Sequence, residues 1–265
     1  MRRLRVIGIG PGGIDQITIA AVEAMNTVDV FLLLDKPNGP RDLRARMLER
    51  YVDRPYTVVA IPDPPRDRTP SDYTDTVARW HHRRAELIAE AIAAQPADAV
   101  LGILVWGDPA IYDSTLRIIG LVEQLGTLLE VDVIAGLMSI NTLTAAHRQV
   151  LNSVGGAVHV TTGRNLRDSG IPPGVDAVVV MLDAHCAFLG FPDWTLFWGA
   201  NLGTADEVIR SGPVAGIGDE VVRLRSELRE RVGWVMDTYL LRAPDPAEPV
   251  APSPVPGFAR PEGER

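Results

Sequence analysis

The sequence contains little cysteine, little lysine and no long apolar run. Cys186 is the only cysteine, so an internal disulfide is excluded, and we expect this thiol to be a small buried group in a protein of a reducing compartment. No stretch approaches the roughly 18 consecutive apolar residues that a membrane helix needs. The arginines at positions 2, 3 and 5 lead into a predicted strand, not into the apolar core of a signal peptide. We therefore expect a cytoplasmic protein.

The charge balance excludes a second class of partners. The net charge is −8 and the pI is about 5.2, whereas nucleic acid and anionic membranes demand a dominant basic face. Lys36 is the only lysine among the 26 basic residues, and arginines cluster at 41–46, 66–68 and 79–84. Codon bias can explain this preference; alternatively, guanidinium forks hold carboxylates through two parallel bonds. Arg66 and Arg68 are the candidates for binding substrate carboxylates.

Short β-branched runs alternate with helical stretches in the first half, which is the pattern of a parallel sheet with crossover helices. Residues 76–94 form one predicted helix with a mainly apolar stripe, which consists of Val77, Trp80, Arg84, Ile88, Ala91 and Ile92. The predicted strands of this half are 4–9, 28–34, 57–61, 99–105 and 131–135.

The chain changes character after Asn152. A linker at 154–156 precedes predicted strands at 158–161, 177–182 and 195–198, followed by a helix at 220–231 and a strand at 234–241. The fold class is therefore α/β, with two α/β domains over residues 1–153 and 154–242. From residue 243, proline, alanine and charged residues alternate without apolar periodicity, which predicts a disordered, proline-rich tail over 243–265.

A glycine-rich segment follows the first predicted strand. Gly8, Gly10 and Gly13 form the pattern GxGxxG, and Asp35 ends the next strand, where dinucleotide-binding folds place the acid that binds a ribose. Taken alone, this pattern indicates a nicotinamide- or flavin-dependent oxidoreductase.

Other residues of the same segment disfavour a dinucleotide site. Such a site places its third glycine in the first turn of a helix whose dipole faces the pyrophosphate, but Pro11 and Gly12 interrupt that entry. Asp15 lies where the phosphate charge would be, and Thr18 is a better N-cap for a helix that starts at Ile19. We interpret Gly10, Pro11 and Gly12 as a wide turn that lines a substrate site.

Two further strand-to-helix turns carry glycine and polar residues. The segment 107–115, GDPAIYDST, follows a predicted strand, and Asp113 or Ser114 can cap the next helix. Gly136 follows another strand, and Ser139 can cap the helix after it or contact a polar ligand group. Because open α/β sheets bind ligands at the carboxyl ends of their strands, both turns are candidate binding loops.

The histidines and the cysteine do not form a metal pattern. His81 and His82 are adjacent, so on a helix they point in different directions and cannot form the i, i+4 pair of a metal site. His185 lies beside Cys186, but sequence neighbours seldom have the geometry of a thiol–imidazole pair. We predict no metal site.

The order and spacing of the three glycine turns carry more information than any one of them. GxGPG near the start, GDPxxY from Gly107 to Tyr112 and GxxS from Gly136 to Ser139 together resemble the tetrapyrrole methylase family. The likeness covers residues 4–240. The segments VIGIGPGG, VFLLLDK, PPRDR and LVWGDPAIYDSTLRII are most similar to the long family members that act on precorrin-5.

The resemblance implies a fold and an activity. Family members have two α/β domains around a cleft, bind S-adenosylmethionine at the domain junction, hold the macrocycle in an open trough and usually form homodimers. The implied reaction is methylation of precorrin-5 at C-1, with release of a two-carbon unit as acetate and formation of S-adenosylhomocysteine. A methyltransferase for another precorrin or siroheme-type ring carbon, a dinucleotide-dependent oxidoreductase and a non-catalytic tetrapyrrole carrier remain alternatives.

The resemblance also implies site residues. Loss of the two-carbon unit needs water and proton transfer, for which Asp35 and Asp15 are the candidate acid/base residues. Ala135 replaces the proline that is more common in the family, and the serine pair on the cofactor side is reduced to Ser139. The residues implied to bind the cofactor are Gly107, Asp108, Pro109, Tyr112, Asp113, Ser114, Gly136, Met138, Ser139, Met181, Leu182, Asn201 and Leu202.

Overall fold

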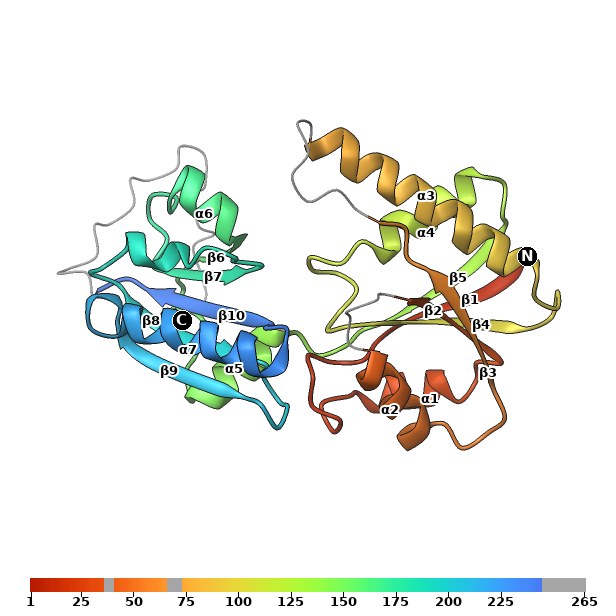
Figure 1. The fold of residues 1–265 in the computed structure, drawn as a ribbon, viewed down its shortest axis with the longest axis horizontal. Coiled ribbons are helices and arrows are strands. Elements are labelled where there is room, and N and C mark those ends of the chain that lie inside the picture. Colours follow the sequence, from red (N-terminus) through yellow and green to blue (C-terminus); the bar gives the residue numbers. More distant parts are fainter. Residues whose placement is uncertain (36–40, 66–72, 245–265) are drawn as a thin grey trace, which may run out of the picture.

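Two five-stranded sheets, each with helices on both faces, form the two lobes of the molecule (Figure 1). The computed structural model describes residues 1–35, 41–65 and 73–244. None of the helices in these ranges combines the length and the apolar character that spanning a membrane requires. The tail predicted over 243–265 lies outside these ranges except for its first two residues.

The first sheet is entirely parallel, with strand order β3-β2-β4-β1-β5. All five predicted strands are confirmed, within a few residues at their ends. They are β1 Arg2–Gly8, β2 Val30–Asp35, β3 Thr57–Pro62, β4 Val100–Val105 and β5 Leu129–Ile134. Every residue of β4 is buried, which is why this central strand is a continuous apolar run in the sequence.

Helices cover both faces of the first sheet. Helices α1, Ile19–Met25, and α2, Arg41–Tyr51, pack on one face. Helices α3, Tyr73–Ala93, and α4, Thr115–Gln124, pack on the other. The predicted apolar stripe on α3 is confirmed at its C-terminal part, because Ile88 and Ile92 are buried in the core between α3 and the sheet.

The second sheet is mixed, with strand order β6-β7-β10-β8-β9. Strands β6, Val158–Thr162, and β7, Ala177–Met181, are parallel. The other three, β8 Thr195–Ala200, β9 Val208–Pro213 and β10 Asp237–Arg242, pair antiparallel to their neighbours. The sequence analysis missed β9, because this edge strand ends in Ser-Gly-Pro, a combination that is typical of turns.

The helix that was predicted in the second half begins earlier in the chain than expected. Helix α7 spans Val214–Val232, six residues longer at its start than the predicted 220–231. It packs with α6, Gly163–Ser169, and the short 3-10 helix Ala187–Gly190 on one face of the second sheet.

The other face of the second sheet is covered by α5, Ser139–His147. Ile140 and Leu143 of this helix are buried against β7 and β10. The domain boundary at residue 153 stays a prediction, but α5 lies on the first-domain side of it and packs with the second sheet. If the lobes are defined by which sheet each element packs on, the chain passes from the first lobe to the second just after β5, as Figure 1 shows.

Candidate functional site

Three glycines bring the ends of three strands of the first sheet into direct contact. Gly8 ends β1, and Gly107 and Gly136 follow β4 and β5. A Cβ atom on Gly8 would lie 2.6 Å from the amide nitrogen of Gly136, and one on Gly136 would collide with the carbonyl of Gly107. The amide of Gly107 donates to the carbonyl of Gly10 at 2.8 Å, and the amide of Gly10 donates back at 3.2 Å. Side chains are excluded at Gly8 and Gly136 because backbone meets backbone there.

Asp108 holds the loop after β4 against the end of β5. Its Oδ1 accepts from the amide of Ala110 and its Oδ2 from the amide of Gly136, both at 2.8 Å. Both carboxylate oxygens are therefore engaged by backbone of the protein itself. The structure thus gives the aspartate of the GDPxxY segment a role in shaping the loop, whereas the resemblance implied a cofactor contact.

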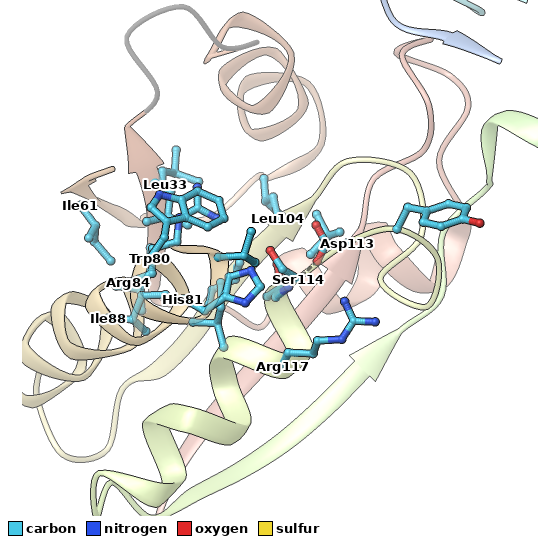
Figure 2. Close-up of a pocket in the computed structure, with 18 of the residues that line it drawn as sticks. Leu33, Ile61, Trp80, His81, Arg84, Ile88, Leu104, Asp113, Ser114 and Arg117 are labelled. Carbon is cyan, nitrogen blue, oxygen red and sulfur yellow. Dashed lines mark hydrogen bonds between the residues drawn. The ribbon is translucent and has the colours of Figure 1, made fainter. Parts of the chain in front are cut away.

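A cavity of about 410 Å³ opens at the carboxyl ends of β2 and β4, between α3 and α4 (Figure 2). Thr162 and Leu182, at the ends of β6 and β7, complete its lining from the second sheet. Leucine and isoleucine side chains form most of its floor. The polar and aromatic residues that line it are Arg44, Trp80, His81, Arg84, Tyr112, Asp113, Ser114, Thr115, Arg117 and Thr162.

The arginines of this cavity differ in how their charges are compensated. Arg84 is buried and forms two hydrogen bonds of 2.6 Å to Asp63, with the ring of Trp80 stacked 3.6 Å from its guanidinium. Arg44 donates from Nε to the carbonyl of Leu104 at 3.0 Å. Neither Arg44 nor Arg117 forms an ion pair with any carboxylate in the part of the chain that the structure describes. Two guanidinium groups thus remain available to an anionic ligand.

Burial and charge act in opposite directions on Arg44. Burial lowers the pKa of its guanidinium, while the negative charge of Asp113 raises it. Arg44 stays protonated at neutral pH because arginine ionises only far above it. The cavity therefore contains a partly desolvated positive charge next to a carboxylate.

Asp113 and Ser114 begin α4, and only Asp113 caps it with its side chain. Oδ1 of Asp113 accepts from the amide of Thr115 at 2.6 Å. Ser114 is the N-cap residue by position, but its hydroxyl makes no capping bond. The expectation that Ser139 caps α5 is wrong, because Met138 occupies the N-cap position and the side chain of Asn141 accepts from its amide at 3.1 Å.

Three of the residues implied to bind the cofactor have left-handed backbone conformations. The φ angles are 48° for Tyr112, 55° for Leu182 and 48° for Asn201. Non-glycine residues in this region cost of order 1–3 kcal/mol each and cluster at ligand sites. Tyr112 is 41% and Leu182 60% exposed. The hydroxyl of Tyr112 donates to the carbonyl of Val160 at 3.3 Å, which links the two lobes beside the cavity.

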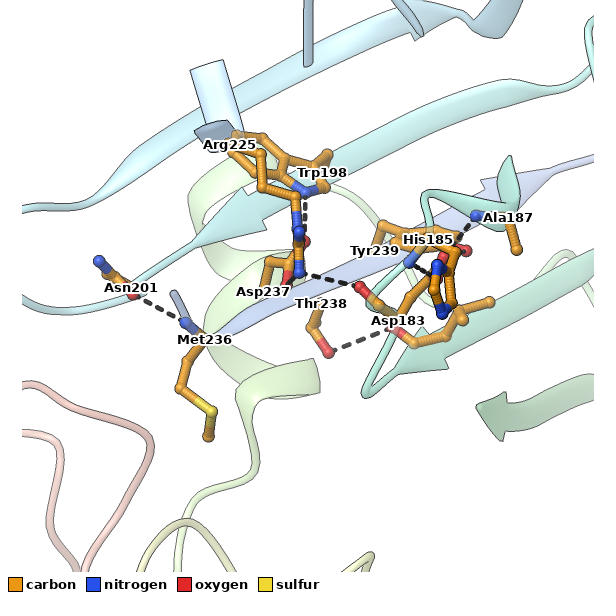
Figure 3. Close-up of polar contacts among 11 residues, drawn as sticks. Asp183, His185, Ala187, Trp198, Asn201, Arg225, Met236, Asp237, Thr238 and Tyr239 are labelled. Atoms are coloured by element: carbon orange, nitrogen blue, oxygen red, sulfur yellow. Dashed lines mark hydrogen bonds and ion pairs between the residues drawn. The ribbon is translucent and has the colours of Figure 1, made fainter. Parts of the chain in front are cut away.

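A buried polar network is centred on Asp183, the residue that follows Leu182 in the chain (Figure 3). Asp183 accepts hydrogen bonds from the Tyr239 hydroxyl at 2.6 Å and from the backbone amides of His185 at 2.9 Å and Ala187 at 2.6 Å. Arg225 donates to the carbonyl of Asp183 at 3.0 Å. The sequence analysis missed this network, which fixes the chain direction after β7.

Arg225 also connects the network to β10 and β8. Its Nε donates to Asp237 at 2.9 Å, and the indole of Trp198 donates to the same carboxylate at 3.1 Å. Burial raises the pKa of Asp237, and its bonds to Arg225 and Trp198 oppose that shift. Burial also raises the pKa of Tyr239 far above its usual range, so this phenol keeps its proton.

The remaining residues of the implied cofactor site lie in the contact region between the lobes. Met138 and Met181 pack against the cluster that contains Leu202 and Ile140. The hydroxyl of Ser139 lies 3.5 Å from that of Thr238. Leu202 is buried, and Pro109 is buried beside the 107–114 loop. Cofactor contacts of these residues stay predictions.

Asn201 shapes the loop that follows β8. Its amide donates to the carbonyl of Met236 at 2.7 Å, and its side-chain oxygen accepts from the amide of Met236 at 3.0 Å. The three residues predicted to line a substrate turn, Gly10, Pro11 and Gly12, are buried. A Cβ atom on Gly12 would lie 2.8 Å from the carbonyl of Leu202. Gly12 therefore contacts the second lobe, and none of the three residues lines the cavity.

Of the predicted acid/base residues and arginines, only Asp15 has a side chain that the structure describes. Asp15 is exposed, accepts from the Tyr51 hydroxyl at 3.2 Å and lies outside the cavity lining. Asp35 ends β2 opposite Pro62, but its side chain lies outside the described residues. Arg66 and Arg68 also lie outside them.

The geometry of the first turn disagrees with a dinucleotide site. Thr18 is the N-cap of α1, and its side chain accepts from the amide of Ala21 at 3.1 Å, as predicted. The third glycine, Gly13, therefore precedes the helix by several residues, and no helix N-terminus faces the glycine turn at the required place. Within the described ranges, no group of three or more His, Cys, Asp or Glu side chains is arranged to hold a metal ion.

Comparison with known families decides the classification of the chain. Residues 3–218 match the profile of the Tetrapyrrole (Corrin/Porphyrin) Methylases. The chain belongs to the tetrapyrrole methylase family. It is 38% identical over 250 residues to a curated Sinorhizobium protein named precorrin-6A synthase [deacetylating], covering 91% of this chain and 95% of the relative.

Solved structures of tetrapyrrole methylases share the fold. A putative cobalamin synthesis related protein (CobF) from Corynebacterium diphtheriae is 36% identical, with a TM-score of 0.76 over 91% of this chain and 98% of that chain. A uroporphyrin-III C-methyl transferase from Thermus thermophilus, complexed with S-adenyl homocysteine, is 16% identical, with a TM-score of 0.55 over 91% of this chain and 92% of that chain. These matches confirm the predicted α/β fold of the tetrapyrrole methylase type, and the second one shows the fold alone.

Proposed function

We propose that this tetrapyrrole methylase transfers a methyl group from S-adenosylmethionine to C-1 of precorrin-5 and releases acetate, forming precorrin-6A. The observation that carries the proposal is the 38% identity to a precorrin-6A synthase [deacetylating], which extends over 91% of the chain and includes both lobes. The segments around 6–13 and 104–119, which form the glycine contacts and part of the cavity wall, lie within residues 3–218 that match the family profile.

We place the cofactor where the two lobes meet, next to the cavity. Tyr112 and Leu182 are exposed apolar side chains held in strained conformations there, and exposed apolar surface of this kind is typical of ligand sites. Gly107 has a φ of 73° and open space around the position of a Cβ atom. Its loop can therefore approach a ligand closely, which fits a cofactor held largely by backbone groups.

The cavity suits part of a large, acidic, mainly apolar ring. Its walls of leucine and isoleucine can contact the faces of pyrrole units, and the ring side chains carry carboxylates. The guanidinium groups of Arg44 and Arg117 line the same cavity without a carboxylate partner among the described residues. We propose that these two arginines, rather than Arg83, bind ring carboxylates, since Arg83 is exposed and pairs with Glu86 at 2.6 Å.

Methyl transfer itself needs little chemical assistance from the protein. The sulfonium of the cofactor already carries a good leaving group, and the macrocycle supplies an electron-rich carbon. The protein must align these two atoms and exclude water, and holding reactants in line is a large source of rate enhancement. The rigid glycine contacts and the Asp183 network position the loops that would provide this alignment.

The proposed setting is a cytoplasmic homodimer that acts on a small molecule. The homodimer and the cytoplasmic setting rest on the family resemblance. The acidic net charge of −8 argues against nucleic acid or an anionic membrane as the main partner. Sedimentation velocity of the purified chain measures the oligomeric state directly. A monomer at all concentrations would contradict the dimer without affecting the proposed reaction.

The first test is calorimetric titration with S-adenosylhomocysteine, with NADH titrated in parallel. We expect saturable binding of S-adenosylhomocysteine and no binding of NADH. An anaerobic assay with precorrin-5 then measures S-adenosylhomocysteine formation and released acetate in equal amounts. Methylation without acetate would indicate another ring carbon or substrate, and binding of NADH alone would contradict the proposal.

A further inference from the structure

Release of acetate poses a chemical requirement that methyl transfer does not. Water must attack the carbonyl carbon of the two-carbon unit, and a base must accept a proton from that water. The base has to be within reach of a ligand in the cavity. Asp15 does not meet this condition, because it lies outside the cavity lining. The side chain of Asp35 lies outside the described residues.

Asp113 is the only carboxylate among the described residues that line the cavity. One of its oxygens, Oδ1, accepts from the amide of Thr115 at 2.6 Å. The other oxygen, Oδ2, has no hydrogen-bond partner among the described residues. The carboxylate is thus fixed in orientation by one oxygen while the second stays available. Asp113 lies at the start of α4, close to Ser114 (Figure 2).

Two features place positive charge close to Asp113. It lies at the N-terminus of α4, where the helix dipole favours negative charge. Arg44 from α2 lines the same cavity and interacts electrostatically with it. Both effects place positive electrostatic potential at the carboxylate.

We propose that Asp113 is the general base that activates water for release of the two-carbon unit. This inference rests on the proposed function. Oδ2 of Asp113 accepts one proton as the water oxygen bonds to the carbonyl carbon. The bond between that carbon and the macrocycle then breaks, its electron pair moves into the conjugated ring, and acetic acid leaves and ionises. No oxidant, reductant or further reactant is needed.

Tyr112 is the neighbouring group that could compete for this role. Burial raises the pKa of its phenol above the ordinary value, so the hydroxyl is neutral at physiological pH and cannot accept the proton. Its bond to the Val160 carbonyl gives it a different role, as a link between the lobes.

The test is Asp113→Asn in the full-length protein, with acetate release as the first readout. Asparagine keeps the oxygen that accepts from the Thr115 amide and removes only the base. We expect acetate release to fall on the order of 10²–10⁴-fold, with unchanged affinity for S-adenosylhomocysteine by calorimetry and an unchanged melting temperature. Asp113→Glu should recover part of the activity, and added formate should partly rescue the Asn variant.

The control is Asp132→Asn, which removes an exposed carboxylate of β5 paired with Arg5 and should behave as wild type. If the wild-type protein does not turn over precorrin-5, the proposed function fails. If it does, and Asp113→Asn releases acetate at the wild-type rate, only the assignment of Asp113 is overturned. The same holds if Asp15→Asn, and not Asp113→Asn, abolishes acetate release.

Discussion

The hydroxyl of Tyr239 donates a 2.6 Å hydrogen bond to the buried carboxylate of Asp183, immediately after the exposed Leu182. We predict that Tyr239→Phe lowers the free energy of unfolding by about 1–3 kcal/mol, the usual cost of removing one partner from a buried polar group. Affinity for S-adenosylhomocysteine should fall as well, since the chain after β7 loses a fixed contact. Chemical denaturation and calorimetry measure the two effects.

The matched control for this variant is Tyr56→Phe. Tyr56 is 37% exposed, and its hydroxyl makes no hydrogen bond within the described ranges. We expect no change in stability or binding. Equal losses in both variants would mean that the Asp183 contact contributes nothing specific.

A methyl group at Gly136 should disrupt the meeting point of three strands. The new Cβ atom would overlap the Gly107 carbonyl and lie 2.9 Å from the Cα atom of Gly8. Overpacking of this kind costs typically about 1–3 kcal/mol, so Gly136→Ala should lower the melting temperature and abolish detectable binding of S-adenosylhomocysteine. Gly120→Ala, in a helix with open space around it, should instead be neutral or slightly stabilising.

Arg44 and Arg117 line the cavity without an ion-pair partner among the described residues. Replacing them should weaken binding of the substrate and not of the cofactor. Bonds to a charged group contribute about 1.5–3 kcal/mol, and 1.4 kcal/mol is a factor of ten. We predict that Arg44→Gln and Arg117→Gln each raise the KM for precorrin-5 roughly tenfold or more, with S-adenosylhomocysteine affinity unchanged. Arg83→Gln is the control. A loss of cofactor affinity instead would assign these arginines to the methionine carboxylate of the cofactor.

Cys186 should be unreactive in the native protein. It is buried as predicted, and burial raises the pKa of its thiol to about 11, from an ordinary value near 9. Because the unfolded thiol ionises first, this group's contribution to stability is complete below pH 9 and declines as the pH rises toward 11. We expect iodoacetamide labelling at pH 8 only after denaturation. Rapid labelling of the folded protein would contradict the burial of this residue.

The elements that could be predicted from the sequence are those whose signal is local. The strands of the first sheet are apolar runs of the right length, and Thr18 has the residue type and position of an N-cap. Strand β9 has no such signal, since its pairing with β8 depends on the tertiary structure. The turns that contain Gly8, Gly107 and Gly136 could be predicted from the sequence. The contact of these glycines with one another depends on the order of the strands in the sheet.

The side chains of the cavity illustrate the same limit. Arg44 belongs to an arginine cluster that the sequence alone could identify, but nothing local shows that it lines the cavity while Arg83 pairs with Glu86 on its own helix. The Asp183 network joins residues that are 42 and 56 positions apart. Such partners are found only when the fold is known.

The position of β1 has a consequence for synthesis and folding of the chain. This first strand pairs with β4 and β5, so Arg3 faces Val100 and Glu130 across about a hundred residues of intervening chain. Contacts between such distant segments form slowly, because closing a long loop costs entropy before the contacts stabilise it. Strand β1 therefore emerges from the ribosome long before its neighbours exist. A chain that ends before residue 134 lacks the complete β5, which is the last strand of the first sheet. It also lacks Gly136, which meets Gly8 and Gly107.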